Sequence, residues 1–395
     1  MIDQLPLDII DIIIRYLNGK DISHLLLTCQ HIYGMRHSLI YRVVIDEHKV
    51  KNLSYYNQFI KLCVKTDNDV VDCSKVFRIY NYQGAIPLIN FIELRELNMS
   101  DYECNMLPSL PPNLRRLRLP STFNGGLVDV LPSSLRVLHL GRKYNQPLYQ
   151  HGRKVLNFGL KCIIFGHDFN QPIISESGSL YLPPSLVEID FGYEFNQPIF
   201  CKKMALGPKL KKLKFGCQFN QSIISQEGLP YIPLSVKDLK LLSLIQIALG
   251  INLNGKKYSA LPNGLTNLKI MVIDGRSIKD YVPKYLESLH IIRLTNGISG
   301  CFPSKLRELR IGFIGLTYEF GHGDLPDTLE LLDINKYNKY IPATIIPNNV
   351  ETLILGHRYE HLLDPDLKVS KIILHNKDLY DYIPYKLMSR VVMEK

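Results

Sequence analysis

The sequence lacks most of the features that would place it among enzymes, membrane proteins or secreted proteins. Its 8 cysteines are scattered, and none forms a CxxC pair of the kind that holds zinc or exchanges disulfides. The longest apolar run without a charged residue, Leu241–Leu253, is interrupted by Gln246 and Asn252 and is too short to span a bilayer. The first residues, MIDQLPLDIID, are acidic where a signal peptide is basic, so we expect no signal peptide. Together these absences predict an intracellular chain with reduced thiols and no membrane partner.

Catalytic signatures are equally sparse. The sequence shows no glycine-rich phosphate loop, no paired-carboxylate site and no serine–histidine or cysteine–histidine arrangement. One segment, HRYEH from His357 to His361, matches the H-x-x-E-H pattern of inverted zincins. Zinc binding there needs both histidines on one face of a helix, whereas the segment aligns position by position with a repeated turn described below. We therefore expect solvated turn residues here, no metal or cofactor, and no enzymatic activity.

Composition sets broad bounds on the partners. The 395 residues are 46% apolar and 21% charged, which is normal for a folded globular chain. The net charge of +10 is moderate for this length. It permits an acidic protein partner without requiring nucleic acid.

One short segment recurs four times in nearly identical form. The copies are GRKYNQPL, GHDFNQPI, GYEFNQPI and GCQFNQSI, which begin at Gly141, Gly166, Gly192 and Gly216. Each copy follows an apolar frame, L-x-x-L-x-L. The frame recurs in thirteen units spaced 19 to 29 residues apart, with first positions at residues 94, 114, 135, 160, 186, 210, 236, 265, 286, 306, 329, 350 and 369. This frame and spacing are typical of leucine-rich repeats.

The frame predicts a stack of short parallel strands. Its second and third apolar positions are two residues apart and therefore point to the same face of a strand, while the residue between them points to the other face. No single unit can bury its apolar face alone, but stacked units bury one continuous core. We therefore predict an α/β repeat solenoid, a leucine-rich-repeat-like arc with a parallel β-sheet on its concave face.

The FNQPI segments are predicted to form the turns that follow the strands. An asparagine lies five residues after the third frame position in six units, at Asn124, Asn145, Asn170, Asn196, Asn220 and Asn296. Stacked asparagines would form a ladder that hydrogen-bonds turn backbone which no strand satisfies. The aromatic residue before each asparagine, such as Phe169, would stack in the interior. The units that begin at 236, 265, 306, 329 and 350 keep the frame but lack this asparagine. The segment is therefore interpreted as a joint of the scaffold rather than a binding motif.

FNQPI after L-x-x-L-x-L-G resembles the FNIP repeat, a leucine-rich-repeat variant abundant in social amoebae and in giant viruses of amoebae. The resemblance covers residues 91–380, and four near-complete copies in phase carry it. It implies a cytoplasmic protein, located in the host cytoplasm if the source is viral.

Residues 1–45 do not fit the repeat and are predicted to form three short helices. Apolar residues recur at helical spacing at Ile9, Ile13 and Leu17, and a following Asn-Gly pair ends this first helix. Asp21 is the expected N-cap of the next helix. So short a segment cannot bury all of its aliphatic side chains internally, and the surplus predicts a partner.

This segment resembles an F-box, the domain that docks on the Skp-type adaptor of cullin-RING (SCF) ubiquitin ligases. The matching positions are Leu5, Pro6, Asp8, Ile9, Ile10, Ile13, Tyr16, Leu17, Asp21, Leu25, Thr28, Cys29, Leu39, Ile40 and Tyr41. The family often has tryptophan in place of Tyr33 and Ile40, and this chain has no tryptophan. The resemblance implies a cullin bound through the adaptor, and adaptor contacts at Leu5, Pro6, Ile9, Ile13, Leu17 and Leu26. The alternative is that these residues only form a cap that buries the first repeat.

Residues 46–90 are predicted to connect this box to the repeats and to seal their first strand. The segment HKVKNLSYYNQFIKLCVK, residues 48–65, is a candidate helix. VFRIYNYQGAI is a candidate degenerate repeat, with Val76 and Ile79 in its first two frame positions. The predicted organisation is a helical domain at 1–45, a connector at 46–90, repeats at 91–380 and a C-terminal tail or cap at 381–395.

Two residues of each predicted strand point away from the core, onto the face where leucine-rich repeats commonly bind partners. The basic candidates for target binding there are Arg116, Arg118, Lys212, Lys214, Lys240, Lys269 and Arg310. They would attract an acidic protein segment; the alternative is a solvated, solubilising face. Mixed charge signs and the lack of interleaved exposed aromatic residues argue against nucleic acid. His139 and His290 are interpreted as isolated strand positions.

The sequence therefore predicts a substrate-recognition subunit of an SCF-type ubiquitin ligase. The box would bind the Skp-type adaptor, and the repeats would bind an unidentified target protein. The alternative is a non-enzymatic interaction scaffold that acts independently of ubiquitin.

Overall fold

The computed structural model describes residues 5–28, 30–42, 44–69, 72–104, 106–201, 203–204, 206–224, 230–242, 261–274, 282–295, 302–314 and 318–393. The chain forms two compact units, Met1–Phe169 and Asn170–Lys395, termed unit 1 and unit 2 below. The boundary between them falls inside the GHDFNQPI segment.

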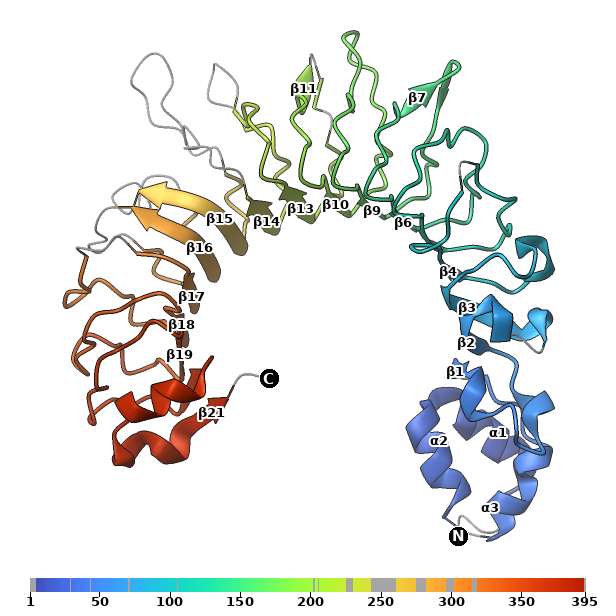
Figure 1. The fold of residues 1–395 in the computed structure, drawn as a ribbon, viewed down its shortest axis with the longest axis horizontal. Helices are drawn as coiled ribbons and strands as arrows, with labels where there is room; N and C mark the ends of the chain where they lie inside the picture. The colour runs from blue at the N-terminus through green and yellow to red at the C-terminus, as the bar shows by residue number, and fades with distance from the viewer. Residues whose placement is uncertain are drawn as a thin grey trace. The chain divides into compact units, whose positions relative to one another are not determined.

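Unit 1 begins with three helices. They are α1 (Leu7–Tyr16), α2 (Gly19–Leu26) and α3 (Gln30–Gly34) (Figure 1). Asn18, rather than the predicted Asp21, caps α2. Asn18 Oδ1 accepts hydrogen bonds from the backbone N–H groups of Lys20 and Asp21, both at 3.0 Å. The cap lies earlier than predicted because α2 already begins at Gly19, and a capping side chain must precede the first unpaired N–H groups.

One face of α1 packs against the chain that follows the helices. Ile10 and Ile14 are buried in an apolar cluster that also contains Tyr41, Phe59 and Leu62. The rings of Tyr41 and Phe59 stack with their centroids 4.6 Å apart. The helices therefore cover the beginning of the sheet.

The sheet of unit 1 is parallel, and its strands pair in chain order. The strands are β1 (Ile45–Asp46), β2 (Leu62–Thr66), β3 (Val76–Asn81), β4 (Glu96–Asn98), β5 (Arg116–Arg118), β6 (Val137–His139) and β9 (Cys162–Ile164). A short antiparallel hairpin of β7 (Tyr149–Gln150) and β8 (Arg153–Lys154) lies in the loop between β6 and β9.

The connector is part of this sheet, and the helix predicted at residues 48–65 is wrong. That segment forms 3₁₀ turns at Glu47–Lys49 and Tyr56–Gln58 and then enters β2. Leu62, Cys63 and Val64 are consecutive and all buried, a pattern that suits a strand covered on both faces rather than an amphipathic helix. Val76 and Ile79 are both buried on β3, as the degenerate repeat predicts.

The sheet of unit 2 is built in the same way as that of unit 1. Its strands are β10 (Glu188–Asp190), β11 (Phe200–Cys201), β12 (Lys203–Met204), β13 (Lys212–Phe215), β14 (Asp238–Leu241), β15 (Asn267–Asp274), β16 (Ser288–Thr295), β17 (Glu308–Ile311), β18 (Leu331–Asp333), β19 (Thr352–Leu355), β20 (Lys371–Leu374) and β21 (Val391–Met393). β11 and β12 form an antiparallel hairpin, and the others pair in parallel in chain order. Two 3₁₀ helices, Lys377–Tyr382 and Tyr385–Arg390, lead into β21.

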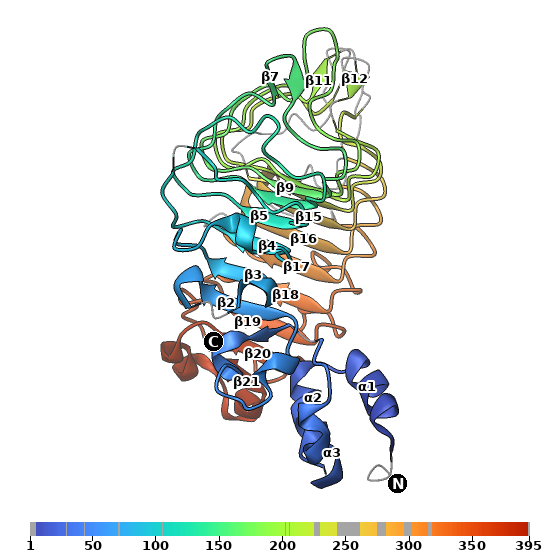
Figure 2. The ribbon, with the colours of Figure 1, turned by 90° about the vertical axis from the view of Figure 1, so that its right-hand side faces the viewer.

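The thirteen predicted frames all lie on these strands. In each repeat the strand begins two residues after the first frame position; for example, β4 begins two residues after Leu94. The burial pattern of Arg116, Leu117 and Arg118 on β5 is exposed, buried, exposed. Within each unit the strands lie side by side, and the loops that return the chain lie on one side of them (Figures 1 and 2). The uncovered side, which carries the residues that flank the buried middle residue of each strand, is termed the open face.

The described parts of the repeats form a parallel β-solenoid without α-helices. Among the residues that the structure describes, α-helices occur only between Leu7 and Gly34. The prediction of an α/β repeat is therefore wrong for the described repeats, and the described α-helices are confined to the N-terminal segment. The return segments contain prolines such as Pro147 and Pro198, which lack a backbone N–H and so oppose helix formation.

The turns have an aromatic interior and a tight backbone. In unit 2 the rings of Phe195 and Phe219 are 6.1 Å apart and nearly parallel, at 3°, and Phe215 stacks on Phe219 at 3.9 Å. Three of the glycines that open the FNQPI segments, Gly141, Gly166 and Gly216, are required by the close approach of successive repeats. A Cβ atom on Gly216 would overlap the carbonyl oxygen of Gly192 in the preceding repeat, so that only glycine fits there.

Candidate functional site

The turn asparagines hydrogen-bond one repeat to the next. In unit 1, Asn124 Oδ1 accepts a hydrogen bond from the backbone N–H of Asn145 at 2.8 Å. In unit 2, Asn170 Oδ1 accepts from the N–H of Asn196 at 2.9 Å, and Asn196 Oδ1 accepts from the N–H of Asn220 at 2.7 Å. These bonds are the rungs of the predicted ladder.

The glutamine of the FNQPI segment adds a second donor to each rung. Gln197 Nε2 donates to Asn170 Oδ1 at 3.0 Å, and Gln221 Nε2 donates to Asn196 Oδ1 at 3.0 Å. These asparagine side chains are therefore occupied within the scaffold, which argues against the segment as a binding site. The sixth predicted asparagine, Asn296, lies outside the described residues.

One rung is absent from the prediction because it lies at a different offset. Asn338 Oδ1 accepts a hydrogen bond from the backbone N–H of Glu360 at 3.0 Å. Asn338 lies four rather than five residues after the third frame position, Ile334, since this turn is one residue shorter. Glu360 belongs to the H-x-x-E-H segment, which lies in the turn after β19 and not on a helix.

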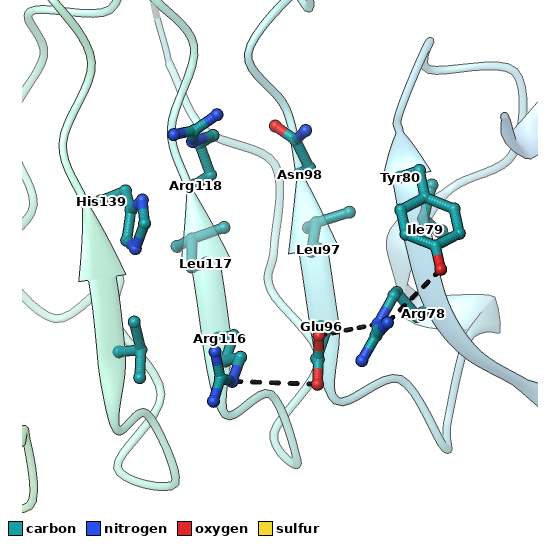
Figure 3. Close-up of a pocket in the computed structure, with 11 residues that line it drawn as sticks. Arg78, Ile79, Tyr80, Glu96, Leu97, Asn98, Arg116, Leu117, Arg118 and His139 are labelled. Carbon is teal, nitrogen blue, oxygen red and sulfur yellow. Dashed lines mark hydrogen bonds and ion pairs between the residues drawn. The ribbon is translucent and has the colours of Figure 1, made fainter. Parts of the chain in front are cut away.

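The open face of unit 1 holds a cavity of about 250 Å³ over β3 to β6 (Figure 3). Glu96 lies there between two guanidinium groups, because its carboxylate is 2.7 Å from Arg78 Nε and 3.8 Å from Arg116 Nε. Arg118 has no acidic side chain within ion-pair distance in the described part of the chain. Its register partner on β6 is His139. Of the two predicted target-binding arginines in unit 1, Arg116 is therefore paired with Glu96, and Arg118 is available to a partner.

The open face of unit 2 brings five basic side chains into one row. Lys214, Lys240, Lys269, His290 and Arg310 are successive register partners on β13, β14, β15, β16 and β17. This set is termed the basic row. The remaining predicted residue, Lys212, lies beside the row and is 3.8 Å from Glu188.

Both ends of the basic row are neutralised, and its middle is not. Lys214 Nζ is 2.7 Å from Asp190 on β10, and Arg310 Nη1 is 3.3 Å from Asp333 on β18. Within the described ranges, no acidic side chain lies within ion-pair distance of the three residues between these ends. Among the described residues, Lys240 and Lys269 are therefore positive charges without an acidic partner, in a row whose two ends are paired with Asp190 and Asp333.

Burial and crowding of positive charge lower the pKa values of two residues in the row. Burial lowers the pKa of Lys269, and the charges of Lys240, Lys214 and Arg310 lower it further. Burial is the main cause that lowers the pKa of His290 to about 4, and the neighbouring positive charges of Lys269, Arg310 and Lys240 contribute as well. His290 is thus neutral at pH 7 and able to donate a hydrogen bond.

His290 lies on a strand, β16, as interpreted from the sequence, and among the described residues it belongs to no cluster of metal-ligating side chains, but its neighbours across the sheet are basic. It lies between Lys269 and Arg310, on the strand between theirs. The sequence already contained this signal. In successive repeats the residue between the second and third frame positions is Lys214, Lys240, Lys269, His290 and Arg310. Because the parallel strands pair in register, residues at the same frame position in successive repeats lie next to one another across the sheet.

The N-terminal helices expose apolar side chains that their own core does not use. Ile9, Ile12 and Tyr16 recur three to four residues apart on α1 and are 43%, 48% and 86% exposed. Leu27, directly after α2, is 75% exposed. Residues at this spacing share one side of a helix, so α1 presents an apolar surface to solvent.

The predicted adaptor contacts divide into three groups. Pro6 and Ile9 are exposed, whereas Leu5, Ile13 and Leu17 are partly buried against the N-terminal core. Leu26 is only 8% exposed and lies within that core, so its assignment as a surface contact is wrong. The helical spacing of α2 turns Leu26 inward and leaves Leu27 at the surface.

The architecture defines the class of protein as a leucine-rich-repeat-like β-solenoid. Among solved structures, the chain is similar to CroV588, described as a novel circular LRR protein, with a TM-score of 0.55 and 22% sequence identity. The match covers 81% of this chain and 50% of CroV588. It supports the fold.

Part of the repeat region matches a known repeat family. The FNIP Repeat family model matches residues 155–194 and 174–218, which confirms the predicted resemblance to the FNIP repeat over these residues. The chain is also 26% identical, over 173 residues, to a FNIP repeat-containing protein of Acanthamoeba polyphaga mimivirus. That match covers 44% of this chain and 37% of the mimivirus protein, so the chain spans only part of the length of its relatives.

Among the described ranges, every helix is too short or too polar to cross a membrane.

Proposed function

We propose that this protein is a substrate-recognition subunit of an SCF-type cullin-RING ubiquitin ligase. Its N-terminal helices dock on the Skp-type adaptor, and the open face of its sheet holds a target protein. The observation that carries the proposal is the exposed apolar surface of α1, in a helical segment joined to a repeat sheet with one uncovered face.

The apolar surface of α1 exceeds what a structural cap requires. Ile10 and Ile14 already supply the buried face that packs against the start of the sheet. Ile9, Ile12 and Tyr16 lie outside that core. Scattered exposed apolar side chains are common on proteins, but a set at helical spacing indicates a surface that a partner covers.

The resemblance to an F-box supplies the identity of that partner, the Skp-type adaptor and, through it, a cullin. The repeats supply the second surface. FNIP and leucine-rich repeats favour protein–protein interaction, because stacked strands present a long row of variable side chains on a rigid sheet. On this proposal the chain performs no chemistry itself. It raises the effective concentration of the target near the ubiquitin-transfer machinery.

A second candidate function is an interaction scaffold that acts without ubiquitin. It accounts equally well for the open face and its charged residues. It differs in the N-terminal segment, which would then serve only to cover the first strands of the sheet. The exposed residues of α1 therefore distinguish the two functions.

Co-purification of the full chain with the Skp-type adaptor from cells tests the proposal. Ile9→Asp combined with Ile12→Asp places two charges on the docking surface without entering the core, and we expect adaptor recovery to be lost. The matched control is Leu234→Asp, because Leu234 is an apolar residue of unit 2 that is 70% exposed. Adaptor recovery should survive that change. Failure of the unaltered chain to retain the adaptor, or equal recovery with the double variant, would favour the scaffold.

A further inference from the structure

We propose that the basic row binds an extended acidic segment of the target protein, and that apolar side chains of the same segment lie on the neighbouring Leu242, Met271 and Ile292. The inference rests on the proposed function only for the source of that segment. It names the chemical class of target: a peptide with interspersed carboxylates and aliphatic side chains.

The length of the row suits an extended peptide rather than a single small anion. Four inter-strand steps of about 4.8 Å separate Lys214 from Arg310, roughly 19 Å in all. About six residues of extended chain cover the same distance. A lone phosphate or carboxylate ligand would instead need several donors converging on one point. The acidic partners of Lys214 and Arg310 mark where the uncompensated stretch ends.

The middle of the row gains most from an incoming anion. Lys240, Lys269 and His290 are adjacent across the sheet and have no acidic partner among the described residues. Like charges about 5 Å apart repel one another, which is consistent with the lowered pKa values of Lys269 and His290. A carboxylate placed beside Lys240 and Lys269 relieves this repulsion and forms new ion pairs, and the neutral imidazole of His290 can donate a hydrogen bond to it.

The residues on either side of the row favour a protein segment over nucleic acid. On one side lie Leu242, Met271 and Ile292, each two residues after its row residue and partly exposed. Leu242 directly follows β14, and the other two lie on β15 and β16. On the other side lie Asp238 and Glu308, whose charges repel a phosphate backbone. The described positions flanking the row include no exposed aromatic residue on which a base could stack.

Fluorescence anisotropy with the full chain tests the inference. The probe is a short labelled peptide of alternating glutamate and leucine residues, used at low ionic strength. Lys240→Gln combined with Lys269→Gln should weaken its binding at least about tenfold. The matched control is Lys336→Gln with Lys377→Gln, two exposed lysines of unit 2 that lie outside the row, and it should change binding less than about twofold. Unchanged melting temperatures in both variants establish that they fold.

Two further probes decide the chemistry of the ligand. The same peptide with glutamine in place of glutamate should bind at least about tenfold more weakly, because it lacks the carboxylates. A labelled oligothymidine of equal length should bind more weakly than the acidic peptide. The inference is overturned if the row variant binds the acidic peptide as well as the unaltered chain, if the glutamine peptide binds equally well, or if the oligonucleotide binds more tightly.

Adaptor binding separates this inference from the proposed function. The variants of the basic row should leave adaptor recovery unchanged, since the N-terminal helices belong to unit 1 and the row to unit 2. Loss of the adaptor interaction with row-dependent peptide binding intact would refute the ubiquitin-ligase role alone. Adaptor binding without peptide binding would refute the row alone.

Discussion

Removal of one ladder asparagine should destabilise the protein in proportion to how deeply its rung is buried. Asn170→Ala deletes the acceptor of two hydrogen bonds, one from the backbone N–H of Asn196 and one from Gln197 Nε2. Both bonds are partly shielded from water. Asn124→Ala deletes an equivalent pair of bonds, from Asn145 and Gln146, that are exposed to solvent. The two substitutions are chemically identical and differ mainly in this exposure.

The expected magnitudes follow from the number of bonds and the fate of the donors. Each bond contributes about 1 kcal/mol net, and a half-buried N–H left without a partner costs about 1 kcal/mol more. Water replaces the lost acceptor at the exposed rung. We therefore expect Asn170→Ala to lower the free energy of unfolding by about 2–3 kcal/mol and Asn124→Ala by about 0.5–1 kcal/mol. The melting temperature should fall by about 2–4 °C for each kcal/mol.

Urea denaturation and thermal melts, both followed by circular dichroism, measure these differences. Binding of the acidic peptide should remain within about twofold of the unaltered chain in both variants, because the turns lie away from the open face. Equal losses of stability in the two variants would show that burial does not govern the rungs. An unchanged melt for Asn170→Ala would refute the ladder as a source of stability.

Three further predictions follow from burial and charge. Gly216→Ala should lower the free energy of unfolding by more than about 3 kcal/mol, or prevent folding, because the added Cβ overlaps the Gly192 carbonyl oxygen. A soluble variant with an unchanged urea midpoint would contradict this close approach. Leu26→Ala should lower the free energy of unfolding by about 2–4 kcal/mol and Ile9→Ala by less than about 0.5 kcal/mol, because only Leu26 is buried. Similar urea midpoints for the two variants would contradict the placement of α2. The pKa of His290 is lower in the folded state, about 4, than its usual value of 6.5, so the unfolded chain binds a proton that the folded chain refuses between these pH values. Stability should therefore fall by about 2 kcal/mol as the pH drops through this window, after allowance for partial solvent exposure, and His290→Gln should remove that part of the pH dependence of the urea midpoint.

The fold of the repeats could be predicted from the sequence because one physical pattern recurs. The frame fixes which residues are buried, and burial fixes the phase of each strand, so that Leu94 and its counterparts all precede a strand by two residues. The turns were less predictable. Asn338 forms a rung at an offset one residue shorter, and a fixed spacing cannot detect it. The requirement for glycine at Gly216 is a contact between repeats that no single unit reveals.

Sequence patterns alone could not predict the secondary structure of the connector or which side chains form the binding surfaces. Residues 48–65 contain apolar residues compatible with either a helix or a buried strand, and contact with the neighbouring strands decides between them. Leu26 and Leu27 are chemically identical neighbours, and only the packing of α2 determines which of them reaches the surface. The candidate lysines could be named from the frame, but the neutralised ends of the basic row depend on which side chains meet across strands.

Calorimetric titration of purified Skp-type adaptor into the full chain tests the central claim most directly. The account predicts saturable one-to-one binding, with the affinity reduced at least about a hundredfold by Ile9→Asp with Ile12→Asp and unchanged by Leu234→Asp. It also predicts a negative heat-capacity change, because apolar surface is buried. The absence of binding heat for the unaltered chain at several temperatures, or equal affinity for the double variant, would contradict the account.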